Sequence, residues 1–425
     1  MKKKYCIAKM HGQIFSFLLD ESGHALEIHC DEADSAGEGE NRKKPQLGDI
    51  YIGRVQSVVK NIRAAFVEIC PDTVCYLPLE DVEEIPRGKE SKAETEKGSG
   101  KGSSPRIRQG DELVVQILRE AIKTKAPTVT TRLCLSGKYG ILDMAHPGIG
   151  VSRKLPEPER ERLRRLGNTF LSEQKEKPEK IPEIGIVLRT NAAKATDEEI
   201  LEELGQLLSR LQRIFDTAPY RTCYSCLHQS PASWMKRLLS LPLEDLEAIR
   251  IEDELLYQQA YEFIRDHIPK LQERLIRYQD DLLSMDKLFS LERELQNALS
   301  ERVWLNCGGY LVIQPTEALT VIDVNSGKCD TGRQKEEAIR KVNLEAARET
   351  ARQLRLRNLS GIILVDFINM QEKETERQVM EMLRQLLTYD PVQAHVVDIT
   401  KLGLVEITRK KTEKPLQESL RGIKE

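Results

Sequence analysis

Two apolar segments that each end near an aspartate, separated by one amphipathic helix, constrain the fold of this chain more than any other feature. The segments are ALTVIDVN (318–325) and GIILVDF (361–367), and residues 333–357 between them have helical spacing. A strand, a crossover helix and a second strand form a unit whose two strands are parallel. Residues 373–388 and 394–400 predict a second helix and a third strand, so we expect the last third of the chain to be α/β.

The main candidate site consists of Asp323 and Asp366, which close the two segments, together with Asn325. The carboxyl ends of parallel strands meet at one edge of an open sheet, where ligands bind. Two carboxylates at close range repel each other unless a proton or a cation lies between them, and Mg²⁺ takes oxygen ligands of this kind. The alternative is that both acids are ordinary strand-end or helix-capping residues. Asp398 ends the third strand, as a further ligand or as a capping residue.

The helix between the two segments carries an apolar stripe and a surplus of basic side chains. The stripe consists of Ile339, Val342, Ala346, Ala347, Thr350 and Leu354. Residues 331–360 hold eight basic and four acidic side chains. Arg352, Arg355 and Arg357 directly precede the second segment and are candidates for holding phosphates near the site. The alternative is a solvated helix face.

Charge and composition leave nucleic acid open as a ligand. The net charge of −3 excludes a uniformly basic polyanion binder, but a local basic surface is enough to bind nucleic acid. No stretch approaches the ~18 apolar residues of a membrane span. The Met-Lys-Lys-Lys start is followed by a segment that polar residues interrupt, unlike a signal peptide. Nine scattered cysteines favour reduced thiols in a cytoplasm over a disulfide framework.

A small β-barrel is predicted in the first third of the chain. Its strands fall in 49–69, 74–82 and 111–118. Residues 84–108 interrupt the barrel with a Lys-, Glu-, Gly- and Ser-rich segment that cannot bury a core, so we expect a disordered loop there. A hairpin over 5–19 that turns at His11-Gly12 precedes the barrel.

Short strands and long helices follow the barrel. TVTTRLCL, YGILD and IGIVLRT predict strands within 126–190. Thr196 and Glu199 have the spacing of a capping box, which predicts the start of a long helix. VWLNC and YLVIQP, around Gly308-Gly309, predict a further hairpin.

Several stretches together resemble the ribonuclease E/G family. LTVIDVNSG, NLEAARETARQLRLRNLSGIILVDFINM and LGLVEITRKK resemble its catalytic core. YIGRVQSVVKNIRAAFVEI followed by YLPLEDV resembles its ribosomal-protein-S1-like OB-fold. TTRLCLSGKYGIL, VSRKL and GIVLRTNA resemble its 5′-end-sensing region, and order and spacing match over most of residues 1–420.

The resemblance implies an α+β and α/β fold of several subdomains, with the barrel inserted into a discontinuous scaffold. The expected parts are an RNase-H-like scaffold (1–44 and 217–290), an S1-like OB-fold (45–125), a 5′-end-sensing region (126–216), a DNase-I-like catalytic subdomain (291–420) and a tail (421–425).

The resemblance also implies a cytoplasmic endoribonuclease that uses Mg²⁺, or Mn²⁺ in its place. Its substrate would be single-stranded, A/U-rich RNA with a 5′-monophosphate, its products would carry 5′-phosphates, and its role would be mRNA decay or rRNA and tRNA processing. Asp323 and Asp366 would hold the metal, and Asn325 would orient the carboxylate and the substrate. The alternatives are a non-catalytic S1-domain RNA-binding protein with weakened cleavage, and a nuclease that acts on DNA.

The resemblance implies RNA contacts at three further places. The 5′-phosphate pocket falls on Arg189, Thr190 and the backbone of Gly137 and Ile141, and Lys125 matches a position that contacts RNA. Phe66 and Tyr76 match two aromatic positions that receive a base. OB-folds bind single strands by stacking bases on such side chains. The alternative for Phe66 is a place in the barrel core.

The sequence departs from the family pattern in two places. Asn369, in DFINM, stands where an acid is common, outside the two metal positions. No cysteine follows Cys329, so we expect no zinc link and no structural zinc, and any homodimer would form by another route. Cys223, Cys226 and His228 lack a second ligand pair at zinc-site spacing, so we expect no metal there.

Overall fold

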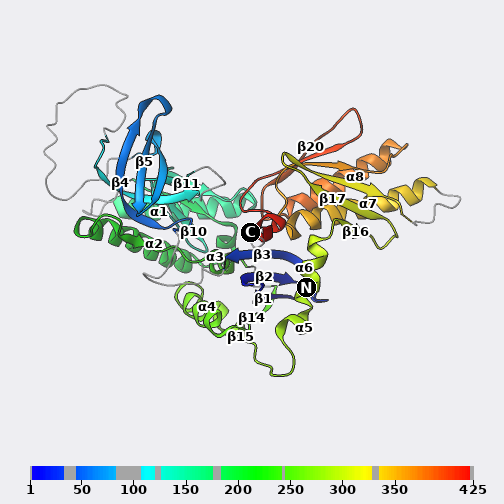
Figure 1. The fold of residues 1–425 in the computed structure, drawn as a ribbon, viewed down its shortest axis with the longest axis horizontal. Coiled ribbons are helices and arrows are strands. Elements are labelled where there is room, and N and C mark those ends of the chain that lie inside the picture. Colours follow the sequence, from blue (N-terminus) through cyan, green and yellow to red (C-terminus); the bar gives the residue numbers. More distant parts are fainter. Residues whose placement is uncertain are drawn as a thin grey trace. The chain divides into compact units, whose positions relative to one another are not determined.

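The computed structural model describes the chain in two compact units. The described residues are 2–32, 45–82, 107–119, 126–175, 183–241, 245–327 and 335–421. Unit 1 consists of Met1–Ala36, Pro242–Arg265 and Pro269–Glu425, and unit 2 of Gly37–Leu241 and Asp266–Ile268 (Figure 1). Most of the expected loop at 84–108, Lys125 and most of the expected tail lie outside the described residues. Within the described part, no helix is both long and apolar enough to cross a membrane.

The first sheet of unit 1 is built on the predicted N-terminal hairpin. Its order is β15 (Leu275–Arg277), β14 (Leu246–Ile251), β1 (Lys3–Met10), β2 (Gln13–Leu19) and β3 (Ala25–Glu32). His11 and Gly12 both have positive φ, 49° and 72°, as the tight turn between β1 and β2 requires. The helix α4 (Glu254–His267) lies between β14 and β15 in sequence, and α5 (Met285–Phe289) and α6 (Leu291–Leu299) follow β15.

The second sheet of unit 1 confirms the predicted α/β order of the last third. Its order is β16 (Arg302–Trp304), β17 (Tyr310–Pro315), β18 (Leu319–Asn325), β19 (Gly361–Asp366), β21 (Val405–Arg409) and β20 (Ala394–Ile399). β18 and β19 are parallel neighbours, as the crossover helix between them requires. The sequence reading missed β21, which lies between β19 and β20 and keeps the predicted third strand away from the site.

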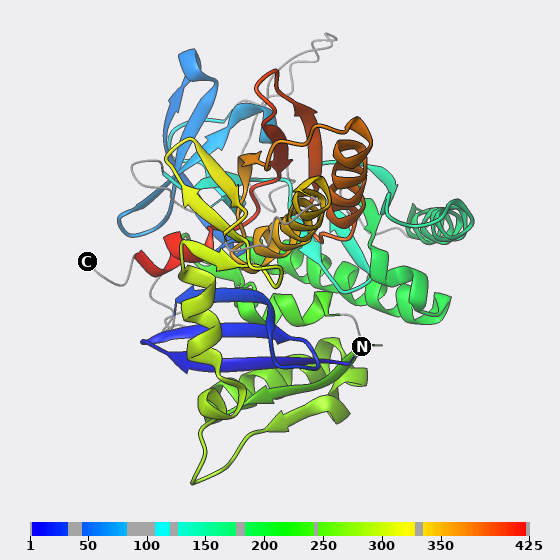
Figure 2. The ribbon, with the colours of Figure 1, turned by 90° about the vertical axis from the view of Figure 1, so that its right-hand side faces the viewer.

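Two helices cover one face of this second sheet (Figure 2). Its other face, the open face, carries the exposed side chains of Asp323, Ile362 and Asp366. α7 (Lys335–Leu356), α8 (Lys373–Thr388) and the inward side chains of the sheet share one hydrophobic core. All six residues of the predicted stripe on α7 are buried, with Thr350 and Leu354 at 0% exposure. Side chains alternate along the strands, so the face that carries Asp323 and Asp366 points away from this core. A last helix, α9, spans Leu416–Arg421.

Unit 2 contains the predicted barrel, closed by five strands. They are β4 (Ile50–Val59), β5 (Ala64–Cys70), β6 (Thr73–Pro78), β8 (Thr128–Thr130) and β7 (Glu112–Arg119), and β7 pairs back to β4. Inward side chains such as Ala65, Val67 and Leu77 form its core. The short strand β13 (Cys226–His228) extends the sheet beyond β4.

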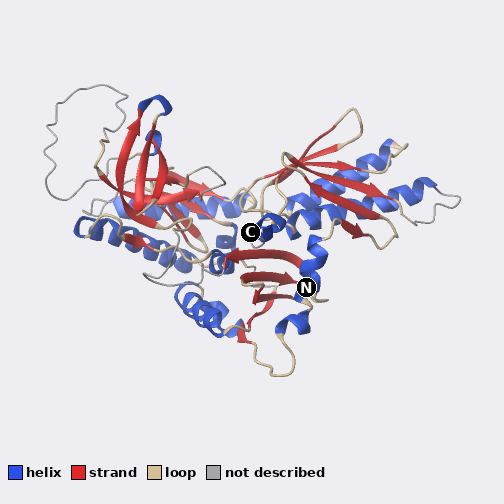
Figure 3. Cartoon of the chain, in the orientation of Figure 1, coloured by secondary structure: helices blue, strands red, loops and turns tan. Residues whose placement is uncertain are grey.

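The remainder of unit 2 packs two long helices against a four-stranded sheet (Figure 3). The order of this sheet is β11 (Gly148–Val151), β12 (Gly185–Leu188), β10 (Gly140–Asp143) and β9 (Cys134–Ser136). Thr196 and Glu199 form the predicted capping box of α2 (Asp197–Thr217). The sequence reading missed α1 (Glu157–Lys175), because only a few of its side chains, such as Leu163 and Phe170, are apolar and buried.

Short helices complete the two units. They are α3 (Ser233–Ser240) and the 3₁₀ helices η3 (Lys60–Ile62), η4 (Leu79–Asp81), η5 (Thr190–Lys194), η6 (Ala218–Tyr220) and η7 (Pro269–Arg274).

Candidate functional site

Asp323 and Asp366 occupy matched positions on adjacent parallel strands. Asp323 of β18 is the direct register partner of Asp366 of β19. Neighbouring strands lie about 4.8 Å apart, so the two carboxylates leave the same face of the sheet side by side. Both side chains are exposed. The sequence-based expectation that the two acids meet at one sheet edge is therefore confirmed for their placement.

Asn325 completes this group from the end of β18. Its Nδ2 donates a hydrogen bond of 2.7 Å to Oδ2 of Asp323, which fixes the orientation of that carboxylate. The donor set consists of the exposed carboxylates of Asp323 and Asp366 and the half-buried amide of Asn325. Such a set fits Mg²⁺ or Mn²⁺, which take oxygen ligands and retain several waters. Among the described residues no group of three or more His, Cys, Asp or Glu side chains is arranged to hold a metal.

Asp398 lies apart from the two aspartates. It is on β20, which β21 separates from β19, and its register partner is Glu406 of β21. Its Oδ1 accepts a hydrogen bond of 2.8 Å from the backbone N–H of Ile399. Of the two roles left open by the sequence, this contact favours the local capping role.

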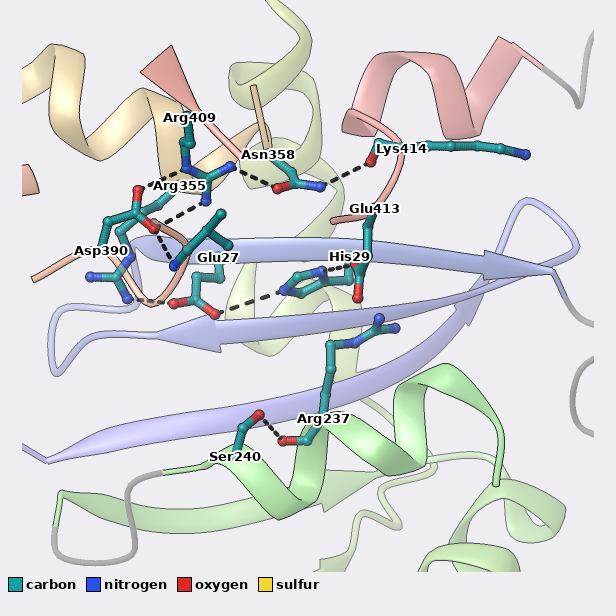
Figure 4. A network of polar contacts seen from close by, with 11 residues as sticks. Glu27, His29, Arg237, Ser240, Arg355, Asn358, Asp390, Arg409, Glu413 and Lys414 are labelled. Atoms are coloured by element: carbon teal, nitrogen blue, oxygen red, sulfur yellow. Dashed lines mark hydrogen bonds and ion pairs between the residues drawn. The ribbon is translucent and has the colours of Figure 1, made fainter. Parts of the chain in front are cut away.

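The three arginines at the end of α7 lie at the opposite end of β19 from Asp366. α7 returns the chain to the start of β19, and the strand then runs for about 17 Å before it reaches the aspartate. Arg352 donates to both carboxylate oxygens of Glu349, and Arg355 forms an ion pair with Glu27 of β3 (Figure 4).

Arg357 is buried, and this burial lowers its pKa to about 10. Its Nε donates a hydrogen bond to Oε1 of Gln353. All three guanidinium groups are thus engaged within the protein. Phosphate binding by them stays a prediction from the sequence, and we do not include them in the proposed site.

Phe66 and Tyr76 lie side by side on the outer surface of the barrel. They are register partners on β5 and β6, with ring centroids 6.3 Å apart in an edge-to-face arrangement. Both are half-buried, whereas the alternate residues Ala65 and Val67 are fully buried. This placement argues against the barrel-core alternative for Phe66 and leaves both rings partly accessible to a ligand.

The four residues predicted for a 5′-phosphate pocket come together in unit 2. Nη1 of Arg189 donates a hydrogen bond of 2.8 Å to the carbonyl oxygen of Gly137. Ile141 lies on β10, which pairs with β12 directly before Arg189. Thr190 follows on the exposed side, and its Oγ1 lies 2.8 Å from Oγ of Ser152. A guanidinium and a hydroxyl thus flank one short backbone loop.

Glu203 of α2 organises this loop, and the sequence reading missed it. Its carboxylate accepts hydrogen bonds from three consecutive backbone N–H groups, those of Lys138, Tyr139 and Gly140, at 2.8, 2.8 and 2.9 Å. Burial lowers the pKa of Arg189, and the charge of Glu203 partly opposes this. No local motif could have identified Glu203, because it acts across more than sixty residues of sequence.

The remaining residues that the sequence singled out are not part of the groups described above. Lys125 lies outside the described residues. Cys226 and His228 belong to β13, and Cys223 lies in the turn before that strand. Burial, with the charges of Arg210, Lys236 and His267, lowers the pKa of His228 to about 4.

Comparison with known proteins finds relatives of this chain in one family. A model of the ribonuclease E/G family matches residues 134–412. Ribonuclease G of Escherichia coli strain K12 is 33% identical over 378 residues, which cover 88% of this chain and 74% of that protein. Ribonuclease G of Haemophilus influenzae is 32% identical over 404 residues, or 95% of this chain and 78% of that protein. Ribonuclease E of Nostoc sp. is 32% identical over 372 residues, or 86% and 51%.

Proposed function

Because the chain belongs to the ribonuclease E/G family, we propose that it is an endoribonuclease whose reaction takes place at Asp323 and Asp366. The observation that carries the proposal is the direct register match of these two exposed aspartates, with Asn325 bonded to the first. Its substrate would be single-stranded RNA, with A/U-rich segments preferred. Its setting would be the cytoplasm, in mRNA decay or in rRNA and tRNA processing.

Asp323 and Asp366 would hold Mg²⁺, or Mn²⁺ in its place. The bound ion supplies activation of water and neutralisation of the developing charge on a phosphodiester, which leaves a 5′-phosphate product. Asn325 keeps the Asp323 carboxylate in one orientation, so that its free oxygen is presented on the open face.

The RNA strand would be held by two further groups in unit 2. Phe66 and Tyr76 offer a stacking surface on the OB-like barrel, which is the surface such folds use for single strands. Arg189 and Thr190, with the backbone of Gly137 and Ile141, would bind a 5′-monophosphate by charge-assisted hydrogen bonds. Lys125 would add a contact. The RNase-H-like scaffold and the DNase-I-like catalytic subdomain remain part of the proposal.

The test is cleavage of a 5′-monophosphorylated single-stranded RNA with Mg²⁺ by the wild type and by Asp323→Asn and Asp366→Asn. We expect cleavage by the wild type, loss of it in both variants and with EDTA, and unchanged RNA binding. Asp398→Asn is the matched control and should cleave normally, because it lies two strands from Asp366.

Each alternative gives a different result. RNA binding by all proteins with cleavage by none would point to a non-catalytic RNA-binding protein. Cleavage that persists in both aspartate variants would refute the site. Cleavage of a matched deoxy-oligonucleotide would favour a nuclease that acts on DNA. Equal rates on 5′-monophosphate and 5′-hydroxyl RNA would refute the 5′-end preference.

A further inference from the structure

The open face of the second sheet of unit 1 carries more than the aspartates. Its residues form cross-strand rows, in which direct register partners share one face. One row runs from Arg302 of β16 through Val312 of β17 to Asp323 and Asp366. The next row runs from Trp304 through Tyr310 to Asn325.

The row from Trp304 to Asn325 begins with two aromatic rings, and the guanidinium group of Arg302 lies over them. The rings of Trp304 and Tyr310 have centroids 5.2 Å apart and planes inclined by 58°. The guanidinium carbon of Arg302 lies 4.5 Å from the centroid of Tyr310 and 5.8 Å from that of Trp304. Arg302 is exposed, and the described residues offer it no carboxylate partner.

Trp304 is 65% exposed, which is unusual for the largest apolar side chain. The chain contains only two tryptophans, and the other, Trp234, is fully buried. Trp304 therefore adds little to the core, and its exposed surface is available to a flat, apolar ligand.

The distance to the aspartates indicates what that ligand is. Tyr310 is the register partner of Asn325, so Asp323 is its diagonal neighbour, about 7 Å away. A nucleotide whose phosphate is at the aspartates has a neighbouring base within reach of this pair. Arg302 would attract the phosphate backbone and also stack on a base.

We propose that Trp304 and Tyr310, with Arg302, form a platform that stacks one nucleobase of single-stranded RNA next to the cleaved phosphodiester. The platform rests on the proposed function, because the aspartates beside it define which phosphate is cut. It is separate from Phe66 and Tyr76, which lie on the barrel of unit 2. Stacking accepts any base, so the platform fixes the position of the strand without choosing a sequence.

Intrinsic fluorescence is the direct test. Trp234 is buried, so a fluorescence change on RNA binding reports Trp304. Asp366→Asn protein, which should leave RNA intact, is titrated with a 5′-monophosphorylated ten-nucleotide RNA of adenosine and uridine. We expect quenching on binding, and we expect its loss in the same protein with Trp304→Phe.

Affinity and cleavage give a second readout. Trp304→Ala and Tyr310→Ala should each weaken RNA binding about tenfold, in the range expected for one stacked base. Tyr389→Ala is the matched control, because Tyr389 is an exposed aromatic residue of the same unit. An RNA series with one abasic ribose at each position should show one position where base removal weakens wild-type binding but leaves Trp304→Ala unchanged.

The outcomes separate the two proposals. Wild-type cleavage with no quenching, or with Trp304→Ala and Tyr389→Ala alike in affinity, overturns the platform alone. Quenching and the abasic signature without any cleavage support the platform as an RNA contact and overturn the proposed function. A dimer that Trp304→Ala converts to a monomer, with RNA affinity unchanged, shows that a second copy covers Trp304 and also overturns the platform.

Discussion

Arg409 and Asp390 form an ion pair in which the side chains are only 3% and 2% exposed. Nε and Nη2 of Arg409 donate to the two carboxylate oxygens at 2.8 and 3.1 Å. Nη1 donates to Asn358 and to the carbonyl of Leu359, both at 2.9 Å (Figure 4). This network fixes the turn between α7 and β19, where Asn358 has a positive φ of 50°.

Arg409→Met should therefore lower the free energy of unfolding by about 3–5 kcal/mol, because it leaves the Asp390 carboxylate buried without its cation. Urea denaturation at neutral pH measures this loss. Arg377→Met is the control, since Arg377 pairs with Glu374 at the exposed surface, where the two side chains are 71% and 57% exposed, and it should leave the urea midpoint unchanged. Equal midpoints for the two variants would contradict the prediction.

Asn325→Ala should raise the Mg²⁺ concentration that gives half-maximal cleavage by about fivefold. The variant removes the 2.7 Å hydrogen bond to Asp323, and one such bond is worth about 1 kcal/mol. A Mg²⁺ titration of the cleavage rate measures the shift. Asn369→Ala, an exposed asparagine after β19, should behave as the wild type. The prediction fails if both variants shift alike.

Glu203→Gln should reduce the preference for 5′-monophosphorylated over 5′-hydroxyl RNA about tenfold. An amide cannot accept from all three backbone N–H groups, so the loop from Gly137 to Gly140 loses its support beside Arg189. The ratio of kcat/KM for the two RNAs is the measurement. Glu202→Gln, on the exposed side of the same helix, should keep the ratio. A normal ratio in Glu203→Gln would refute the positioning role.

Stability should decrease between pH 6.5 and pH 4 because of His228. Its pKa in the folded state is about 4, below the ordinary 6.5, so the unfolded chain takes up the proton first as the pH falls. The contribution is complete above pH 6.5 and is lost towards pH 4, up to about 3 kcal/mol. Denaturant unfolding at several pH values should show a weaker pH dependence for His228→Gln. Parallel curves for the two proteins would exclude this assignment.

The sequence alone predicted the elements whose signals are local. Strand alternation, the stripe on α7, the turn at His11-Gly12 and the capping box at Thr196 each depend on residues a few positions apart. The crossover rule then placed Asp323 and Asp366 at the same end of two parallel strands. The fold made these strands direct neighbours and set the register that pairs the two aspartates.

Tertiary structure decided everything that depends on which strands and side chains meet across the chain. β21 enters the sheet between β19 and β20 and isolates Asp398, although nothing in its own sequence specifies its neighbours. Arg355 meets Glu27 across more than three hundred residues, so its charge is used within the protein. Likewise, Trp304 lies two strands from Asp323, on the same face of the sheet, only because β16, β17 and β18 pair in this register. Side-chain identity is local, but contact requires the fold, and the fold determines which charges and rings remain available to a ligand.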